Sequence, residues 1–492
     1  MRPSMLCVLI MLCTSVPGQA LELTINLSDG DPLTSDNPFG ITYDPDGTHA
    51  YVSLCGDLPP WPLPPTPWAP AWNNDKVVKL NLTTGAQVAM GTAGHFPEDI
   101  ALTLDASGQT RHVYVNNSSS GTVTCLSPTL NPIATISLTP CTGGTYGSVF
   151  PFGIAASPDG ARIYAGGTSC ATVDVIDSDP QSPAFNQVLQ SFSVPNLFGR
   201  PAWLDTTHIV FPVTSYNFNP SLGYSDGSTT GLSVVDVTNP ASLTTWMVTP
   251  FQQFNYPQIT DIAVTPTGTV VAAIGYGLTP RVVEVDAGSG ALLRTLDLGP
   301  AVGVGLHGVA LSPDGSTLAV TALNGGELAL IDIAAFATIS VTPTGLPGSV
   351  TLPNEVIFSP DGSRLGVTLQ GAAAVQIYGG LPSYALGLWA DPVVTLGNTG
   401  ALGVHHVQAG HAAWTYVSDS PGPSIYGPWT IQIGVPFSLL ATLSAAIDGT
   451  AQTSIQIPVI PGLFGTTFHL QAVTVDGNGS VRLSNHVATT IN

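Results

Sequence analysis

Basic residues are scarce in this sequence. Lys and Arg together number 10 among 492 residues, against 31 Asp and Glu, and the formal net charge is −21. A nucleic-acid binder needs a positive surface that displaces counterions from phosphates, so nucleic acid is excluded as a partner. An anionic membrane surface would repel the same charge. A negative field instead enriches cations near the protein, which favours a metal ion as a partner.

The composition also argues against long helices and membrane spans. Asp, Glu, Lys and Arg make up 8% of the chain, against about 25% in ordinary globular domains, and Glu, Lys and Arg are strong helix formers. Beyond the N-terminal segment, no apolar run reaches the roughly 18 residues of a membrane helix, so we expect no integral membrane segment. The 53 Gly and 43 Pro residues supply turns instead. The composition predicts an all-β protein with many short strands.

Several catalytic and metal-binding motifs are missing. The chain contains no CxxC pair, which excludes a zinc ribbon and a thioredoxin-like site. It contains no GxSxG nucleophile elbow, and His405, His406 and His411 lack the HExxH spacing of a metalloprotease helix. Any chemistry in this protein must therefore come from residues that the fold brings together.

The first 20 residues have the pattern of a secretory signal peptide, which we place at 1–20. Arg2 is the only charge, Met5–Val16 is an apolar core, and Gly18–Ala20 ends in a small residue suited to cleavage. The pattern predicts an exported protein, either periplasmic or extracellular. An exported location permits disulfides among the cysteines that follow the signal, which are Cys55, Cys125, Cys141 and Cys170.

A turn that is preceded each time by a similar apolar segment recurs through residues 21–383. An apolar strand runs into a Pro-Asp-Gly turn or a variant of it, in which Pro fixes φ and Gly accepts a positive φ. The turn glycines are Gly47, Gly108, Gly160, Gly268, Gly315 and Gly362. The interval from Gly160 to Gly268 is about twice the others, and a degenerate copy, Trp203–His208, lies within it. The sequence therefore contains seven repeats.

Most repeats supply four short strands that are apolar on both faces. This pattern is expected when four-stranded sheets pack radially against each other, so residues 21–383 are predicted to form a seven-bladed β-propeller. The seventh repeat ends after three strands, at Ala374–Tyr378, whereas a spare strand, Leu21–Leu27, precedes the first repeat. We expect this strand to complete the last blade and close the ring, because closure hides sheet edges that would otherwise aggregate.

The repeats resemble those of a known family. The second-strand copy Val113–Asn117 and the Ser-Pro-Asp-Gly turns are similar to those of YVTN-type, lactonase-like seven-bladed propellers, over about 360 residues. The resemblance implies the same fold, which hosts hydrolases, binding proteins and scaffolds.

Residues 384–492 lack the repeat. They alternate apolar and polar residues between Gly and Pro turns, as in Ile431–Gly434 and Phe468–Val475. This alternation predicts a small antiparallel β-sandwich. We interpret it as an accessory domain without chemistry of its own.

The segments that lead into the first strands are predicted to converge at the propeller axis. These entrances are placed at 38–40, 97–99, 151–153, Pro201–Trp203, 259–261, 306–308 and 353–355. Carboxylate and amide oxygens suit a hard cation such as calcium. The predicted ligands are Glu98, Asp99, Asp261, Asn354 and Glu355. The resemblance implies a similar site, because calcium-dependent propeller lactonases use a comparable acidic and amide set near the axis. The alternative is that these side chains cap the strand entrances and bind channel waters.

An insertion in the first repeat is rich in Pro and Trp, and it contains Trp61, Trp68 and Trp72. Its indoles offer flat faces on a chain stiffened by proline. We predict that these tryptophans, with Phe39 and Phe152 of two entrances, bind a small molecule, a glycan or a protein. The alternative is a self-packed cover over an apolar rim.

The face of the propeller that carries the entrances, which we call the channel-mouth face, is also predicted to carry a second insertion, Tyr216–Gly231. The loops of Cys55, Cys141 and Cys170 fall on the same face, whereas Cys125 lies toward the far end of its strand. Among these cysteines we prefer a disulfide between Cys141 and Cys170.

Two functions follow from these observations. The first is an exported binding or scaffold protein that presents a ligand platform on the channel-mouth face. The alternative is a metal-assisted lactone or ester hydrolase of the lactonase-like type, with His307 or a carboxylate as the base. The first is favoured because the sequence contains no evident nucleophile–base pair.

Overall fold

The computed structural model describes two groups of residues. The first group is 20–28, 36–56, 74–140, 150–219, 224–249, 252–253, 256–275, 280–299, 302, 305–345 and 350–379. The second is 387–390, 393–394, 399–405, 412–418, 421–426, 429–433, 438–444, 451–456, 466–475 and 481–491. The predicted signal, apart from Ala20, and the insertion with Trp61, Trp68 and Trp72 lie outside these ranges.

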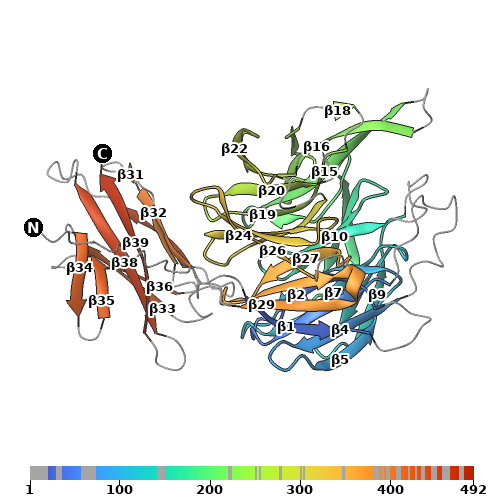
Figure 1. Cartoon of the computed structure of the whole chain (residues 1–492), viewed down its shortest axis with the longest axis horizontal. Coiled ribbons are helices and arrows are strands. Elements are labelled where there is room, and N and C mark those ends of the chain that lie inside the picture. Colours follow the sequence, from blue (N-terminus) through green and yellow to red (C-terminus); the bar gives the residue numbers. More distant parts are fainter. Residues whose placement is uncertain are drawn as a thin grey trace, which may run out of the picture.

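Seven antiparallel sheets, here called blades 1–7 in chain order, are formed by the described residues between 20 and 379 (Figure 1). Blade 1 contains β2 (Pro38–Tyr43), β3 (His49–Leu54), β4 (Lys76–Asn81) and β5 (Gln87–Thr92). Blade 2 contains β6 (Pro97–Leu104), β7 (Thr110–Asn117), β8 (Thr122–Leu126) and β9 (Pro132–Ser137). Blade 3 contains β10 (Pro151–Ala156), β11 (Arg162–Gly167), β12 (Thr172–Asp177) and β13 (Val188–Ser193).

The remaining blades follow the same plan, with two variations. Blade 4 contains β14 (Ala202–Trp203), β15 (His208–Asn219), β16 (Tyr224–Asp236) and β17 (Leu243–Met247), and β18 (Gln252–Gln253) pairs with β16. Blade 5 contains β19 (Gln258–Val264), β20 (Thr269–Gly275), β21 (Arg281–Asp286) and β22 (Leu292–Asp297). Blade 6 contains β23 (Leu306–Leu311), β24 (Thr317–Ala322), β25 (Glu327–Asp332) and β26 (Ala337–Pro343). Blade 7 contains β27 (Pro353–Phe358), β28 (Leu365–Leu369), the 3-10 turn η1 (Gln370–Ala372), β29 (Ala374–Gly379) and β1 (Ala20–Asn26).

The N-terminal strand β1 is the outer strand of blade 7. It pairs antiparallel with β29, and the register places Ala20 opposite Gly379 and Ile25 opposite Val375. An ion pair between Glu22 Oε2 and Arg364 Nε, 3.0 Å apart, adds a polar contact to the same blade. The first and last strands of the propeller are therefore hydrogen-bonded to each other.

The Pro-Asp-Gly turns connect the first and second strands of their blades. In blade 6, Gly315 N donates to Ser312 O (2.7 Å), and Gly315 has a φ of 71°. Asp314 accepts the N–H of Ser316 at 2.9 Å, which fixes the turn from its own side chain. Glycine is required at this position because a left-handed φ is costly for residues that carry a Cβ.

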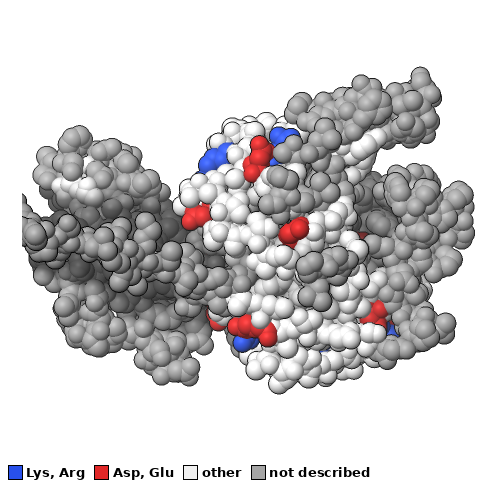
Figure 2. Space-filling model, in the orientation of Figure 1, with Lys and Arg blue, Asp and Glu red and all other residues white. Residues whose placement is uncertain are grey.

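Charged side chains are sparse on the surface. On the face drawn in Figure 2, the described residues include a few Asp, Glu, Lys and Arg side chains, some of them beside a residue of opposite charge, among predominantly uncharged residues. None of the described residues belongs to a helix long and apolar enough to cross a bilayer.

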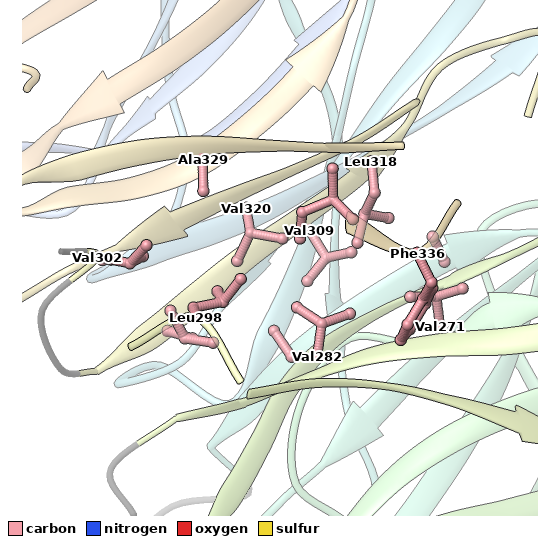
Figure 3. Close-up of a cluster of buried hydrophobic side chains, with 14 residues drawn as sticks. Val271, Val282, Leu298, Val302, Val309, Leu318, Val320, Ala329 and Phe336 are labelled. Carbon is pink, nitrogen blue, oxygen red and sulfur yellow. The ribbon is translucent and has the colours of Figure 1, made fainter. Parts of the chain in front are cut away.

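The hydrophobic core is divided among the gaps between blades. Each of the seven pairs of neighbouring blades in the described residues has its own buried cluster, including the pair formed by blades 7 and 1. Figure 3 shows the cluster between blades 5 and 6, where Val271 and Val282 face Val309 and Val320. Strands buried on both faces explain why the sequence is apolar on both sides of each strand. The ring is therefore closed by packing as well as by hydrogen bonds.

The described strands after residue 386 form a separate group of sheets. One sheet has the order β30 (Gly387–Ala390), β32 (Thr399–His405) and β37 (Ala451–Gln456). The other has the order β31 (Val393–Val394), β39 (Val481–Ile491), β38 (Thr467–Val475), β33 (Ala412–Ser418) and β36 (Ser438–Ser444). A hairpin joins β34 (Pro421–Tyr426) to β35 (Trp429–Ile433). β30 contacts β38 and β39, so the two sheets pack together as a sandwich. The pairing is antiparallel except between β31 and β39, which are parallel.

The predicted fold class, an all-β propeller followed by a small sandwich, is confirmed. The predicted domain boundary at 383/384 falls among residues 380–386, outside the described residues, and stays a prediction. Ala20, placed by the sequence at the end of the signal, is the first residue of β1.

Cys55 and Cys125 are buried thiols. Burial raises the pKa of the Cys125 thiol to about 11, so it is protonated and unreactive at neutral pH. Because Cys141 lies outside the described residues, its pairing with Cys170 stays a prediction.

Candidate functional site

The register of the first two strands defines one equivalent position in every blade at the propeller axis. In blade 1, Ile41 pairs with Val52, and in blade 4, Ala202 pairs with Val210. In each blade, the first-strand residue two positions before this pair occupies the equivalent place. We call these seven residues together the hub ring. Its members are Phe39, Glu98, Phe152, Arg200, Thr260, His307 and Asn354.

Contacts between blades that are not neighbours show that the hub ring lies at the axis. The ring centroids of Phe39 and Phe152, from blades 1 and 3, are 6.1 Å apart. The His307 ring of blade 6 is 6.0 Å from Phe39 and 6.3 Å from Phe152. Arg200, which leads into blade 4, places its guanidinium carbon 5.8 Å from the centre of Phe39.

Arg200 is the central cation of the hub. Its Nη2 lies 3.0 Å from Glu355 Oε2, its Nη1 lies 3.4 Å from Asp261 Oδ2, and its Nε lies 3.6 Å from Asp99 Oδ1. Its backbone N–H donates to Thr260 O at 2.9 Å. Burial alone would lower the pKa of Arg200, but the carboxylates outweigh it and raise that pKa above its usual value. One guanidinium therefore joins carboxyl groups from blades 2, 5 and 7.

The three carboxyl groups also bind the next blade directly. Each comes one residue after the hub ring and accepts a backbone N–H from the first strand of the following blade. The contacts are Ile154 N to Asp99 Oδ2 (3.2 Å), Val309 N to Asp261 Oδ2 (2.7 Å) and Ile41 N to Glu355 Oε2 (2.9 Å). Burial raises the pKa of Asp261 to about 6, against the lowering effect of Arg200. The carboxyls thus act as cross-links between blades.

Hydroxyl groups form a second set of links between blades. Each donates to a main-chain carbonyl of the hub ring in the next blade, namely Ser53 to Glu98 O, Thr260 to His307 O (2.8 Å), Thr321 to Asn354 O (2.6 Å) and Thr368 to Phe39 O (2.8 Å). The blades approach closely here, and a Cβ at Gly40 would lie 2.2 Å from Glu98 O. Glycine is therefore needed at that position.

Aromatic side chains close the hub on the channel-mouth face. Phe39 and Phe96 are buried and Phe152 is 9% exposed, whereas Phe150 and Phe198 are half-buried. Phe198 stacks on Phe152 with centroids 5.4 Å apart. The more exposed Phe150 and Phe198 thus lie against the buried Phe96 and Phe152.

His307 is buried beside these aromatic rings. Burial and the nearby Arg200 charge lower its pKa to about 3. Its Nδ1 has no hydrogen-bond partner among the described residues. At neutral pH the imidazole of His307 is therefore uncharged, and it lies against the rings of Phe39 and Phe152.

Replacing His307 by Phe is expected to make the protein more resistant to acid. In the unfolded chain His307 becomes protonated below about pH 6.5, whereas in the folded protein it stays neutral down to about pH 3. Stability is therefore lost as pH falls through this window. Between pH 6.5 and 4.5, His307→Phe should lose about 2–3 kcal/mol less stability than the wild type, measured by urea denaturation. Equal losses in both proteins would contradict a buried neutral His307. Phe is a suitable replacement because blades 1 and 3 carry it at the same ring position.

The predicted calcium ligands do not fit a divalent cation. Asp99, Asp261 and Glu355 face the Arg200 guanidinium, which supplies the positive charge that a metal would supply. Glu98 contacts a serine hydroxyl instead. Among the predicted ligands only Asn354 has buried side-chain polar atoms without a hydrogen-bond partner among the described residues, and one amide is too few ligands for a cation. No group of three His, Cys, Asp or Glu residues in the described part of the chain is arranged to hold a metal ion.

The predicted entrance of blade 4 is wrong by two residues. The strand pairs of Ala202 and Trp203 with Val210 and Ile209 place Gly199–Pro201, not Pro201–Trp203, at the axis. The fourth repeat has no Pro-Asp-Gly turn from which to count, and β14 has only two residues. Arg200 was missed for this reason. The scarcity of basic residues could have drawn attention to Arg200, because it is one of only 10 Lys and Arg residues.

Two of the predicted ligand-binding residues, Phe39 and Phe152, are brought together at the hub. Trp61, Trp68 and Trp72 lie outside the described residues, so their contribution stays a prediction. Ser118, which contacts Glu98, was not singled out from the sequence at all.

Comparisons with known proteins bear on the fold. No known protein-family model matches the sequence, and no curated protein matches it. Among solved structures, hydrazine synthase from Kuenenia stuttgartiensis is similar, with a TM-score of 0.52 and 18% identity over 71% of this chain and 98% of that one. Streptogramin B lyase gives 0.49 and 13% over 72% and 97%. The β-propeller domain of Cps50 (Swd1) from Myceliophteria thermophila gives 0.47 and 13% over 74% and 99%. At such identities the likeness concerns the propeller fold alone.

Proposed function

We propose that this protein is an exported binding or scaffold protein, and that its propeller presents a ligand platform on the channel-mouth face. The observation that carries the proposal is the state of the hub. Its carboxyl groups are engaged by Arg200 and by the backbone of the next blade. They serve to hold the ring together, which leaves recognition to the loops around the mouth.

The rim supports this proposal. Phe150 and Phe198 are half-buried and lie against the buried rings of Phe96 and Phe152, with centroids 6.2 and 5.4 Å apart. Aromatic side chains with one accessible face are frequent in binding sites for small molecules and proteins. The tryptophan-rich insertion leaves blade 1 between β3 and β4, and we propose that Trp61, Trp68 and Trp72 extend this aromatic surface. The ligand is a small molecule, a glycan or a protein.

The hydrolase alternative is not favoured. A metal-assisted reaction needs a cation and a base within reach of a bound water. At the hub, the guanidinium of Arg200 lies among the carboxyl groups, where the catalytic cation would have to bind. The His307 ring lies against Phe39 and Phe152.

The double substitution Trp61→Ala and Trp68→Ala is expected to weaken ligand binding about ten-fold or more, because tryptophans often dominate binding energy. Its thermal midpoint should stay close to that of the wild type. Binding partners are first found by screening oligosaccharide and peptide libraries against the mature protein, and affinities are then measured by calorimetry.

Trp246→Ala is the matched control for this test. Trp246 is half-buried and its Nε1 donates to Ala287 O of blade 5 at 3.3 Å, so its loss should lower the thermal midpoint and leave binding unchanged. If the Trp61 and Trp68 substitutions lower the midpoint without weakening binding, the insertion is a cover and the proposed platform is wrong. Failure of the wild type to bind any member of either library would also count against it.

A further inference from the structure

A buried chain of polar atoms joins blade 2 to blade 3 beside the hub. Glu98 and Ser118, both of blade 2, are 1% and 0% exposed. Ser118 Oγ is in hydrogen-bond contact with Glu98 Oε2, and it also lies 2.5 Å from Pro151 O, the first residue of β10 in blade 3. Asn116 Nδ2 donates to the same carbonyl at 2.8 Å.

The Ser118 hydroxyl makes two close contacts with oxygen atoms, and each of these contacts needs a hydrogen of its own. The Ser118 hydroxyl has one proton to donate. The Pro151 carbonyl can only accept, and an ionised Glu98 could only accept as well. Two acceptors and one proton would leave one of the two close contacts without a hydrogen. The conflict disappears if Glu98 keeps its proton, donates to Ser118 Oγ, and Ser118 donates to Pro151 O.

We propose that Glu98 is a buried carboxylic acid that keeps its proton at neutral pH and acts as a proton-linked lock between blades 2 and 3. The negative charge of the hub is then limited by the Arg200 guanidinium and by the proton on Glu98. This differs from the metal site that the residue types alone suggest.

The surrounding charges support this assignment. The charged groups that act on Glu98 are Asp99 on the same strand and Arg200 before β14. The other titratable groups of the hub interact with Arg200, namely Asp261 on β19, His307 on β23 and Glu355 on β27. Together these groups amount to three other carboxyl groups and one cation, because His307 is neutral. Burial raises the pKa of Glu98 well above its usual value, and Asp99 adds to the increase, against the opposing effects of Ser118 and Arg200.

A protonated Glu98 has a definite effect on the pH dependence of stability. A carboxyl whose folded-state pKa is raised contributes stability that is present at low pH and is lost as pH rises toward that folded-state pKa. Unfolding then releases one proton. When Glu98 ionises, its donation to Ser118 is lost and a further negative charge faces the hub. We expect the seam between blades 2 and 3 to weaken in alkaline solution.

Glu98→Gln tests the proposal, because the amide N–H₂ imitates the donation of the acid and cannot ionise. Between pH 5.5 and 6.5, the unfolding equilibrium constant of the wild type should rise about ten-fold per pH unit relative to that of Glu98→Gln. Glu22→Gln is the matched control, since Glu22 is exposed and paired with Arg364, and it should follow the wild type. Parallel pH profiles for wild type and Glu98→Gln would overturn the proposal.

Infrared spectroscopy of the folded proteins gives a second and direct measurement. At pH 7, the difference spectrum of wild type minus Glu98→Gln should contain the carbonyl stretch of a protonated carboxyl. Loss of a carboxylate stretch instead would show that Glu98 is ionised and would refute the lock. If Glu98→Gln does not fold, Ser118→Ala replaces it. This variant removes the acceptor of the Glu98 proton, so it should shift the protonated-carboxyl band of the wild type, and an unchanged spectrum would contradict the proposal.

Discussion

Replacing Arg200 by alanine is expected to lower the free energy of unfolding by about 3–5 kcal/mol, the range found when one partner of a buried ion pair is removed. The Arg200 side chain is 6% exposed and contacts carboxyl groups from three blades. Without the guanidinium, these groups would be buried near one another with no cation among them. Urea denaturation at pH 7 measures the loss.

Arg162→Ala is the matched control for this substitution. The Arg162 side chain is 37% exposed and forms one ion pair, with Asp177 at 2.9 Å. Only the Arg162 side of this pair is exposed, because the Asp177 side chain is 3% exposed. The Asp177 carboxylate keeps its hydrogen bond from Ser182 Oγ (2.6 Å) when Arg162 is removed, so we expect a loss of about 1–2 kcal/mol, smaller than that of Arg200→Ala. Similar losses for Arg200→Ala and Arg162→Ala would show that the hub cation is dispensable.

Acid should partly rescue Arg200→Ala. The pKa of Asp261 is about 6 with the guanidinium present, and losing that positive charge would raise it further. At pH 5 the uncompensated carboxyls would therefore take up protons and repel each other less. A loss of stability as large at pH 5 as at pH 7 would argue that Arg200 matters for packing alone.

The substitution Ile25→Asp in the closing strand is expected to destabilise the propeller by several kcal/mol, because it buries a carboxylate without a partner. Ile25 is 4% exposed and packs in the cluster between blades 7 and 1, with Val375 and Ile41. Detachment of β1 would also leave β29 as an unpaired edge, which is prone to aggregation. Thermal unfolding and size-exclusion chromatography measure the two effects.

Leu21→Asp provides the comparison within the same strand. Leu21 is 51% exposed, so a carboxylate there stays in water and should change stability by less than about 0.5 kcal/mol. If Ile25→Asp were as mild as Leu21→Asp, β1 would not be needed to hold the ring closed.

These predictions treat the hub as a structural element, whereas the residue types alone suggest a metal site. The difference comes from which way neighbouring side chains point. Glu98 and Asp99 are consecutive residues of one strand, and successive side chains of a strand point to opposite faces. Asp99 reaches the first strand of blade 3 and Glu98 reaches Ser118, so the two carboxyls do not converge on one ion.

A change of register at the hub adds to this effect. The pairing of the first two strands shifts at this end in six of the seven blades, for example between Pro97 and Ile100 in β6. Irregularities of this kind redirect side chains. The final direction of each hub side chain therefore depends on a backbone detail that residue spacing does not contain.

The class of fold can be derived from local features of the amino-acid sequence. Turn glycines with positive φ, such as Gly47 and Gly315, and strands apolar on both faces are local properties, and they predict radially packed sheets before any coordinates are known. The spare N-terminal strand could be assigned in the same way, because a last repeat with three strands needs a fourth.

The role of the hub residues, in contrast, depends on contacts that form only in the folded ring. Arg200 lies in the repeat that has no Pro-Asp-Gly turn. Its partners Asp99, Asp261 and Glu355 are far from it in sequence. Ser118 matters because a carbonyl of the next blade lies beside it. Charge pairing and proton placement depend on distances of a few ångströms between distant segments, and these distances exist only once the ring has closed.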